Sequence, residues 1–140
     1  MDDTNDAPPH RGGCLCGAVR YEIAGPLRQV VSCHCSQCLR THGHYAAYSA
    51  AARDDLSIDG AENVTWHRSS DTAQRGFCRI CGSRLFWQMF DADYIAVAAG
   101  TLDTPTGLAT VRHIFVDDKP DYYDLTDGLP QLPQGHDRRR

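Results

Sequence analysis

Seven cysteines are the residues of this chain best suited to chemistry, and all of them fall into three short motifs. The two outer motifs are pairs, Cys14-Leu15-Cys16 and Cys78-Arg79-Ile80-Cys81, and the middle motif contains Cys33, Cys35 and Cys38. Thiolates grouped this closely are typical ligands of a metal ion, and an odd number of cysteines would leave a disulfide framework with one thiol over. The motifs therefore predict metal binding.

Zinc is the expected metal, because it accepts tetrahedral sets of thiolates at about 2.3 Å and needs no redox partner. An iron–sulfur cluster is the competing interpretation, and it would colour the protein brown, whereas zinc would leave it colourless. The cysteine count predicts two zinc ions per chain, because the seven thiols divide into a set of four and a set of three.

The two outer pairs predict one closed structural zinc site with four sulfur ligands, Cys14, Cys16, Cys78 and Cys81. Glycines flank both pairs, and their backbone freedom lets the chain turn successive thiolates toward one ion. The free energy of binding a structural zinc is also free energy of folding. We therefore expect this site to stabilise the domain.

The middle motif has three thiols and no fourth cysteine, which is the ligand count of a zinc ion whose fourth position takes water or substrate. Alternatively, His34, His42, His44 or His113 could supply the fourth ligand, or the motif could bind no metal. Zinc with three thiolates carries a net negative formal charge, so it activates a bound water only weakly. It suits a substrate thiol, which would bind as the thiolate. The motif thus predicts thiol chemistry.

Short strands are expected to position these motifs, because apolar and polar residues alternate along much of the chain. Val19, Tyr21 and Ile23 form one apolar face, and similar segments predict strands at residues 29–33, 45–49, 64–68, 73–77, 84–89, 94–98 and 111–116. One short helix is expected over Ser36–Thr41, with Ser36 as its N-cap. The predicted fold class is mainly β.

The chain of 140 residues, 41% of them hydrophobic, predicts a single domain. Residues 1–10 and 129–140 are proline-rich or charged and aperiodic, so we predict flexible tails around a domain over 11–128. Apolar runs are too short for a membrane span, which predicts a soluble, cytoplasmic protein. The net charge of −4 argues against a nucleic-acid partner. No particular oligomeric state is predicted.

The motifs together resemble the GFA family, named after glutathione-dependent formaldehyde-activating enzyme, which also contains centromere protein V. The resemblance covers about residues 11–125 and rests on four stretches. These are Gly13-Cys14-Leu15-Cys16-Gly17-Ala18-Val19-Arg20-Tyr21, Cys33-His34-Cys35-Ser36-Gln37-Cys38-Leu39-Arg40, Phe77-Cys78-Arg79-Ile80-Cys81-Gly82-Ser83 and His113-Ile114-Phe115-Val116. It implies an Mss4-like fold of several small coiled antiparallel β-sheets. It also implies a structural zinc on the outer pairs and an active-site zinc on Cys33, Cys35 and Cys38.

The namesake enzyme joins glutathione and formaldehyde into S-hydroxymethylglutathione and is classed, in the reverse direction, as a carbon–sulfur lyase. The resemblance therefore implies a zinc-dependent enzyme that acts on the adduct of a small thiol and an aldehyde. A noncatalytic, zinc-stabilised binding module is the alternative hypothesis. A third hypothesis makes Cys35 and Cys38 a redox pair, but the β-rich pattern gives no thioredoxin-like setting.

Three residues are candidate substrate contacts: Arg40, His42 and His113. Arg40 and His42 directly follow the middle motif and could bind a substrate carboxylate, although a cation near a helix C-terminus is also favoured electrostatically. His113 lies on an apolar strand, where a hydrogen-bonded core histidine is the more common case. Arg20 and Arg84 are further candidates for binding the carboxylates of a glutathione-like substrate.

Overall fold

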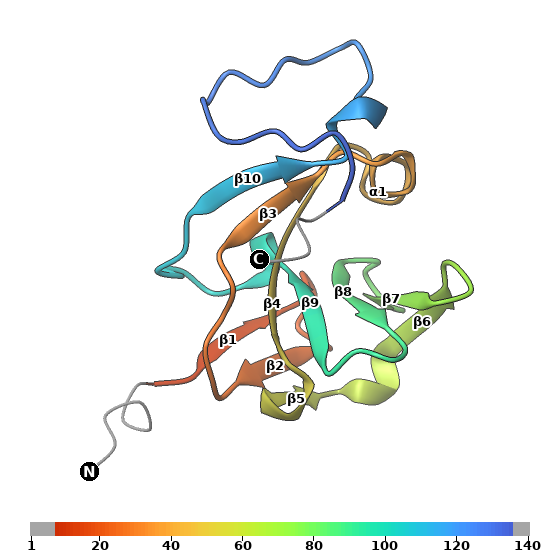
Figure 1. Cartoon of the computed structure of the whole chain (residues 1–140). Coiled ribbons are helices and arrows are strands. Elements are labelled where there is room, and N and C mark those ends of the chain that lie inside the picture. Colours follow the sequence, from red (N-terminus) through yellow and green to blue (C-terminus); the bar gives the residue numbers. More distant parts are fainter. Residues whose placement is uncertain (1–7, 136–140) are drawn as a thin grey trace.

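The computed structural model describes residues 8–135, and the strands of this part of the chain form two sheets (Figure 1). The smaller sheet has the order β1-β2-β5 and consists of β1 (His10–Gly13), β2 (Arg20–Ile23) and β5 (Leu56–Asp59). The larger sheet has the order β10-β3-β4-β9-β8-β7-β6. Its strands are β3 (Val30–Cys33), β4 (Ala46–Ala52), β6 (Val64–Arg68), β7 (Ala73–Cys78), β8 (Arg84–Met89), β9 (Tyr94–Ala98) and β10 (Thr110–Ile114).

The helical elements are short. Helix α1 (Ser36–His42) follows β3. Single 3-10 turns occur at η2 (Arg53–Asp55), η3 (Ala61–Asn63), η4 (Ala99–Thr101) and η5 (Val116–Asp118). Within residues 8–135, no helix has the length and apolar character needed to cross a bilayer.

The predicted mainly β fold of small antiparallel sheets is confirmed, with one parallel pair between β10 and β3. Strands β6, β8 and β9 have the predicted bounds, whereas β1 and β5 were not predicted. Strand β1 contains two glycines, whereas β5 does alternate, with Leu56 and Ile58 half-buried and Ser57 and Asp59 exposed, so its signal was missed. Strand β10 ends earlier than predicted, because Phe115 adopts the left-handed backbone conformation with φ 57°.

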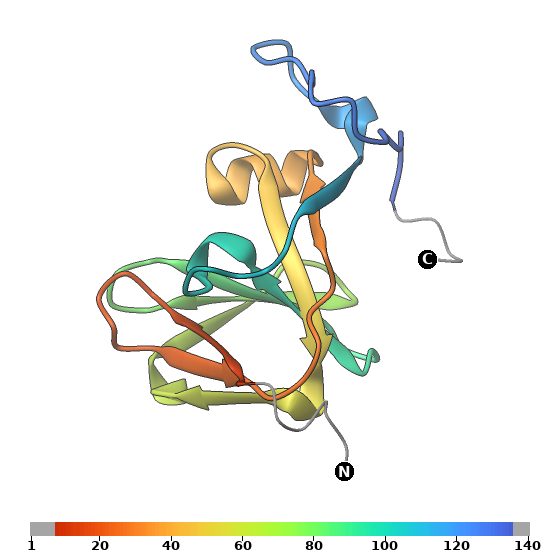
Figure 2. The same ribbon diagram turned by 90° about the vertical axis from the view of Figure 1, so that its left-hand side faces the viewer.

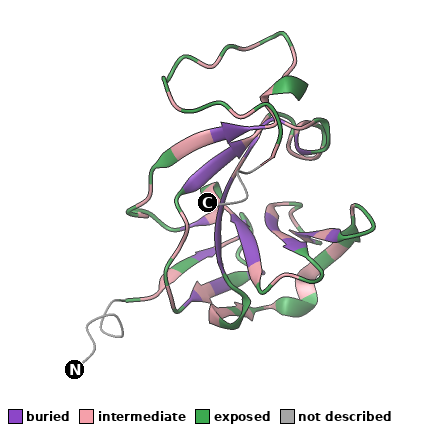
Figure 3. Ribbon diagram, in the orientation of Figure 1, coloured by how far each residue is buried: buried purple, intermediate pink, exposed green. Residues whose placement is uncertain are grey.

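The main core lies where the smaller sheet packs against β8 and β9. Val19, Tyr21 and Ile23 are buried as their alternation predicts, and they pack with residues such as Phe86 and Val97. Figure 3 shows that buried residues concentrate on the central strands β3, β4 and β9, while the turns at the rim are exposed. The core therefore holds together the two sheets whose turns carry the outer cysteine pairs.

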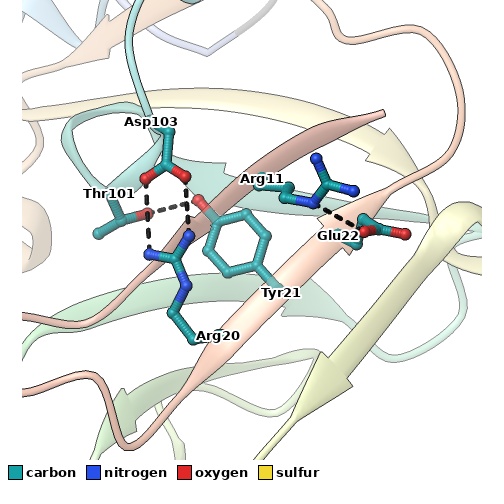
Figure 4. A network of polar contacts seen from close by, with 6 residues as sticks. All are labelled: Arg11, Arg20, Tyr21, Glu22, Thr101 and Asp103. Carbon is teal, nitrogen blue, oxygen red and sulfur yellow. Dashed lines mark hydrogen bonds and ion pairs between the residues drawn. The ribbon is translucent and has the colours of Figure 1, made fainter. Parts of the chain in front are cut away.

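Polar contacts also tie β2 to the segment after β9 (Figure 4). The guanidinium of Arg20 lies 2.7 Å from an oxygen of Asp103, and the hydroxyl of Tyr21 lies 2.7 Å from Oγ1 of Thr101. Arg20 is therefore engaged in an ion pair, and it lines neither of the two cavities described below. The structure gives no support to Arg20 as a substrate contact.

The N-cap of α1 is Cys35, and the prediction of Ser36 was wrong. Cys35 has the extended backbone typical of an N-cap, and its sulfur accepts a hydrogen bond from the backbone N–H of Cys38 at 3.2 Å. The helix ends at Gly43, which has φ 82° and donates its N–H to the carbonyl of Leu39. One metal-ligand candidate thus also starts the helix that carries the next one.

Part of the predicted C-terminal tail belongs to the folded domain. His113 donates its N–H to the carbonyl of Pro130, and Leu132 donates in turn to the carbonyl of His113, both at 2.9 Å. This segment lies beside β10, on the side of the molecule away from the smaller sheet (Figure 2). Backbone pairing needs no apolar periodicity, which is why composition suggested a tail. Likewise, His10 is the first residue of β1. The rest of the predicted tails, residues 1–7 and 136–140, lies outside the described residues.

Candidate metal centres

The first candidate centre joins the two sheets. Cys14 and Cys16 lie in the turn between β1 and β2, and Cys78 and Cys81 lie at the turn between β7 and β8. Their Sγ atoms all lie within 4.8 Å of one another. Leu15 donates its backbone N–H to Oγ of Ser83 at 3.0 Å, so the two turns also contact each other directly. The structure groups these four sulfurs as the sequence predicts.

The spacing of these sulfurs fits a tetrahedral metal. Sγ of Cys16 lies 3.7 Å from that of Cys14 and 3.8 Å from that of Cys78. A tetrahedron with metal–sulfur bonds of about 2.3 Å has edges of about 3.8 Å. The backbone N–H groups of Val19 and Ile80 donate to the sulfurs of Cys14 and Cys78 at 3.3 and 3.4 Å. The four cysteines could therefore hold a zinc ion.

The second candidate centre is built from one local segment. Cys33 ends β3, Cys35 caps α1 and Cys38 lies in its first turn, and the three Sγ atoms lie within 4.8 Å of one another. Within the described residues, no fourth histidine, cysteine or carboxylate joins this group. Hydrogen bonds from Cys33 and Cys38 lower the pKa of the Cys35 thiol. These three sulfurs could hold a second metal ion.

The two buried histidines near this centre bond to each other. Nε2 of His34 lies 2.9 Å from Nδ1 of His113, Nδ1 of His34 lies 2.7 Å from the hydroxyl of Tyr123, and Nε2 of His113 lies 2.8 Å from Oδ2 of Asp127. Burial, together with the nearby His113, lowers the pKa of His34 to about 4. All four ring nitrogens are therefore engaged, which favours a core role for His113 over a substrate contact.

The remaining candidates near the second centre lie outside its cavity. His42 has Nε2 3.2 Å from the hydroxyl of Tyr48, and burial lowers its pKa to about 4. His44 bonds through Nδ1 to the hydroxyl of Tyr122. Arg40 is exposed, and neither Arg40 nor His42 lines the cavity beside Cys33 and its partners. The geometry therefore gives no support to Arg40 or His42 as substrate contacts.

Arg75 is the residue at this centre that sequence reasoning missed. It points inward from β7, only 6% of its surface is exposed, and its Nη2 donates to Oε1 of Gln37 at 3.0 Å. The same nitrogen lies 3.6 Å from Sγ of Cys38. A sequence signal did exist, because Arg75 lies on the same face of a predicted strand as the apolar residues Ala73 and Phe77. A buried cation here offsets the negative charge of thiolates.

A cavity of about 430 Å³ opens beside the second centre. The three cysteines line it together with mostly apolar side chains, which include Val31, Tyr48, Trp87, Ala96 and Ile114. A second, more polar cavity of about 460 Å³ is lined by Trp66 and Arg84, among others. Gln37 and Arg75 line both cavities, so they separate one from the other. A ligand in the first cavity would lie against the sulfurs.

Fold and site together define a mostly β domain with two cysteine centres that could bind metal. The family model for glutathione-dependent formaldehyde-activating enzyme matches residues 9–118, and the chain belongs to this family. The resemblance seen in the sequence is thereby confirmed.

Several relatives support this assignment. An uncharacterized lyase of Schizosaccharomyces pombe is 28% identical over 120 residues, which cover 84% of this chain and 86% of the relative. A Halomonas elongata protein, provisionally named glutathione-dependent formaldehyde-activating enzyme, is 29% identical over 126 residues. The match covers 81% of this chain and 79% of that protein. The crystal structure of a Rhodobacter sphaeroides protein superposes with a TM-score of 0.59 at 31% identity, covering 69% of this chain and 91% of that one.

Proposed function

We propose that this protein is a zinc-dependent enzyme of the carbon–sulfur lyase type that acts on the adduct of a small thiol and an aldehyde. The observation that carries the proposal is the second centre: three cysteine sulfurs without a fourth protein ligand among the described residues, at the wall of a cavity. The names of the family and of its relatives support the same reaction type.

The reaction adds the S–H bond of a thiol across the C=O bond of an aldehyde. Sulfur bonds to the carbonyl carbon, and the oxygen takes the proton; the lyase direction reverses both changes. A zinc ion at the second centre would supply a position that takes the thiol as its thiolate. Cys33, Cys35 and Cys38 would hold that ion, and the guanidinium of Arg75 would offset the negative charge of the thiolates beside it.

The first centre has a structural role in this proposal. Its four cysteines leave no position for a substrate, because four thiolates complete a tetrahedral site. Its ligands come from two turns on different sheets, so a bound zinc would fix the sheets relative to each other. The noncatalytic binding module remains the alternative that the following experiment tests.

The test is the metal content of the protein purified under reducing conditions, followed by thiol titration of the cobalt-substituted form. We expect about two zinc ions per chain, one after Cys35→Ser, and a change in the cobalt absorption spectrum when glutathione or 2-mercaptoethanol is added. One ion per chain, or a cobalt spectrum that no thiol changes, would favour the noncatalytic module. The Ser36→Ala variant is a matched control, because Ser36 is exposed and its neighbour Cys35 caps the helix.

A further inference from the structure

The cavity beside the second centre is much larger than formaldehyde requires. At about 430 Å³ it falls within the range of pockets that hold drug-sized ligands, roughly 300–1,000 Å³. Formaldehyde has only two heavy atoms and would leave most of this space unfilled. The size of the cavity therefore points to a larger group on the thiol or on the carbonyl compound.

The walls of the cavity favour an apolar group. Its lining is dominated by aliphatic and aromatic side chains, and within the described residues it includes no carboxylate. Arg28 and Arg75 are its cationic residues, and Arg28 already donates to the carbonyl of Tyr48 at 2.9 Å. A polar peptide placed against such walls would lose water from its amide groups without gaining partners, which costs free energy. Burial of a hydrocarbon group against the same walls is favourable.

Arg75 is a cationic donor in the wall of the cavity, beside the second centre. Its Nε is buried and has no hydrogen-bond partner among the described residues. A buried donor without a partner costs free energy, and the cost is larger when the donor is charged. Because Nη2 of the same guanidinium lies 3.6 Å from Sγ of Cys38, this unpaired donor is close to the second centre. Nε has almost no surface that a ligand could reach, but the Arg75 side chain lines the cavity, so a carbonyl oxygen bound there would accept from the terminal nitrogens of the guanidinium.

We propose that the carbonyl substrate of this centre carries a bulky apolar substituent, which lies against Trp87, Ala96 and Ile114, and that Arg75 donates a hydrogen bond to its oxygen. This inference rests on the proposed function and names its substrate class. The oxygen keeps an acceptor lone pair as a carbonyl and as the hydroxyl of the adduct, so Arg75 contacts it on both sides of the reaction. The apolar substituent takes no part in bond making.

The test measures binding of two ketones that differ in the apolar group, cyclohexyl methyl ketone and acetone, to the zinc-loaded protein. The chain has two tryptophans, and Trp66→Phe leaves Trp87, which lines the cavity, as the fluorescent reporter. We expect a saturable change in Trp87 fluorescence with cyclohexyl methyl ketone, and at least tenfold weaker binding of acetone. Equal affinity for the two ketones, or no saturable binding of either, would overturn the proposal.

Two arginine variants test the hydrogen bond. Arg75→Met should weaken binding of cyclohexyl methyl ketone by about tenfold or more, since a hydrogen bond from a charged group contributes about 1.5–3 kcal/mol. Arg84→Met is the matched control, because Arg84 lines only the polar cavity, and it should leave the affinity unchanged. Circular dichroism and zinc content show whether each variant is folded. If Arg75→Met does not fold, Arg75→Lys, which keeps the charge and loses the planar guanidinium with its terminal donors, is expected to weaken binding in the same way. A folded variant at position 75 with unchanged affinity would refute the role of Arg75.

This binding assay needs neither a thiol nor turnover, so its outcome is separate from that of the cobalt titration. If thiols alter the cobalt spectrum but the ketones bind equally, the proposed function stands and the apolar substrate class is wrong. If cyclohexyl methyl ketone binds selectively but no thiol reaches the metal, the cavity is confirmed as an apolar carbonyl site and the lyase proposal fails.

Discussion

Replacing Cys78 by serine should destabilise the domain far more than replacing Cys35. The side chain of Cys78 is fully buried in the core, next to residues such as Val19 and Phe86. A structural zinc contributes roughly 10–16 kcal/mol of apparent binding free energy in small peptides, which is about 2.5–4 kcal/mol for each of four ligands. A buried serine hydroxyl without a partner adds about 1–3 kcal/mol. We expect Cys78→Ser to lower the free energy of unfolding by about 4 kcal/mol or more.

The Cys35→Ser variant is the matched comparison. Serine is itself a favoured N-cap, so it can replace the sulfur that accepts from Cys38. The second centre also closes only the short segment from Cys33 to Cys38, so its metal restrains little chain, whereas the first centre links turns on two sheets. We expect Cys35→Ser to retain a cooperative unfolding transition while the second metal is lost.

Urea unfolding followed by circular dichroism, with metal content measured on the same samples, decides between these expectations. Typical domains are stable by only 5–15 kcal/mol, so the loss in Cys78→Ser is large enough to unfold much of the sample or to shift its midpoint strongly. Equal destabilisation by the two substitutions would refute the division of the cysteines into a structural and a reactive centre.

Three further predictions concern residues outside the two centres. Gly60→Ala should lower the free energy of unfolding by about 2 kcal/mol or more, because Gly60 has φ 82° and an added Cβ would collide with the carbonyl oxygen of Ala18. Urea unfolding measures this loss, and an unchanged midpoint would contradict the prediction. Arg20→Gln should lower the free energy of unfolding by at most about 1 kcal/mol, since the ion pair of Arg20 is half exposed. It should also leave thiol binding to the cobalt-substituted protein unchanged, and a loss of thiol affinity would restore Arg20 as a substrate contact. His42 has its pKa lowered to about 4 by burial, so below pH 6.5 the unfolded chain binds a proton that the folded chain does not, and stability falls as the pH falls toward 4. Comparison with His42→Gln should show that this residue contributes a slope of up to about 1.4 kcal/mol per pH unit, and equal slopes for the two proteins would refute the assignment.

Local patterns predicted much of the fold. Apolar segments identified β6, β8 and β9 with their bounds: β6 alternates, whereas β8 and β9 bury consecutive residues and read as short apolar runs. The strands β1 and β5 are held by pairing with β2, and the segment around Leu132 is held by pairing with β10. Backbone hydrogen bonds to a neighbouring strand leave no pattern in the side chains, so β1 and the Leu132 segment were not predictable from sequence, whereas the alternation of Leu56 and Ile58 in β5 was visible and missed.

The sequence by itself determined the three cysteine motifs, since spacing and flanking glycines are local properties, and the ligand count of four and three predicted how the motifs combine. The structure places the seven sulfurs in the same two groups. Only the tertiary structure decided what surrounds them. It buries Arg75 beside Cys38, and it engages the ring nitrogens of His34 and His113 in hydrogen bonds with each other and with their neighbours. It also forms the apolar cavity from β3, β4, β8, β9 and β10. These contacts join residues distant in the chain, and their distances depend on how the strands are ordered in the sheet, which no short stretch of sequence encodes.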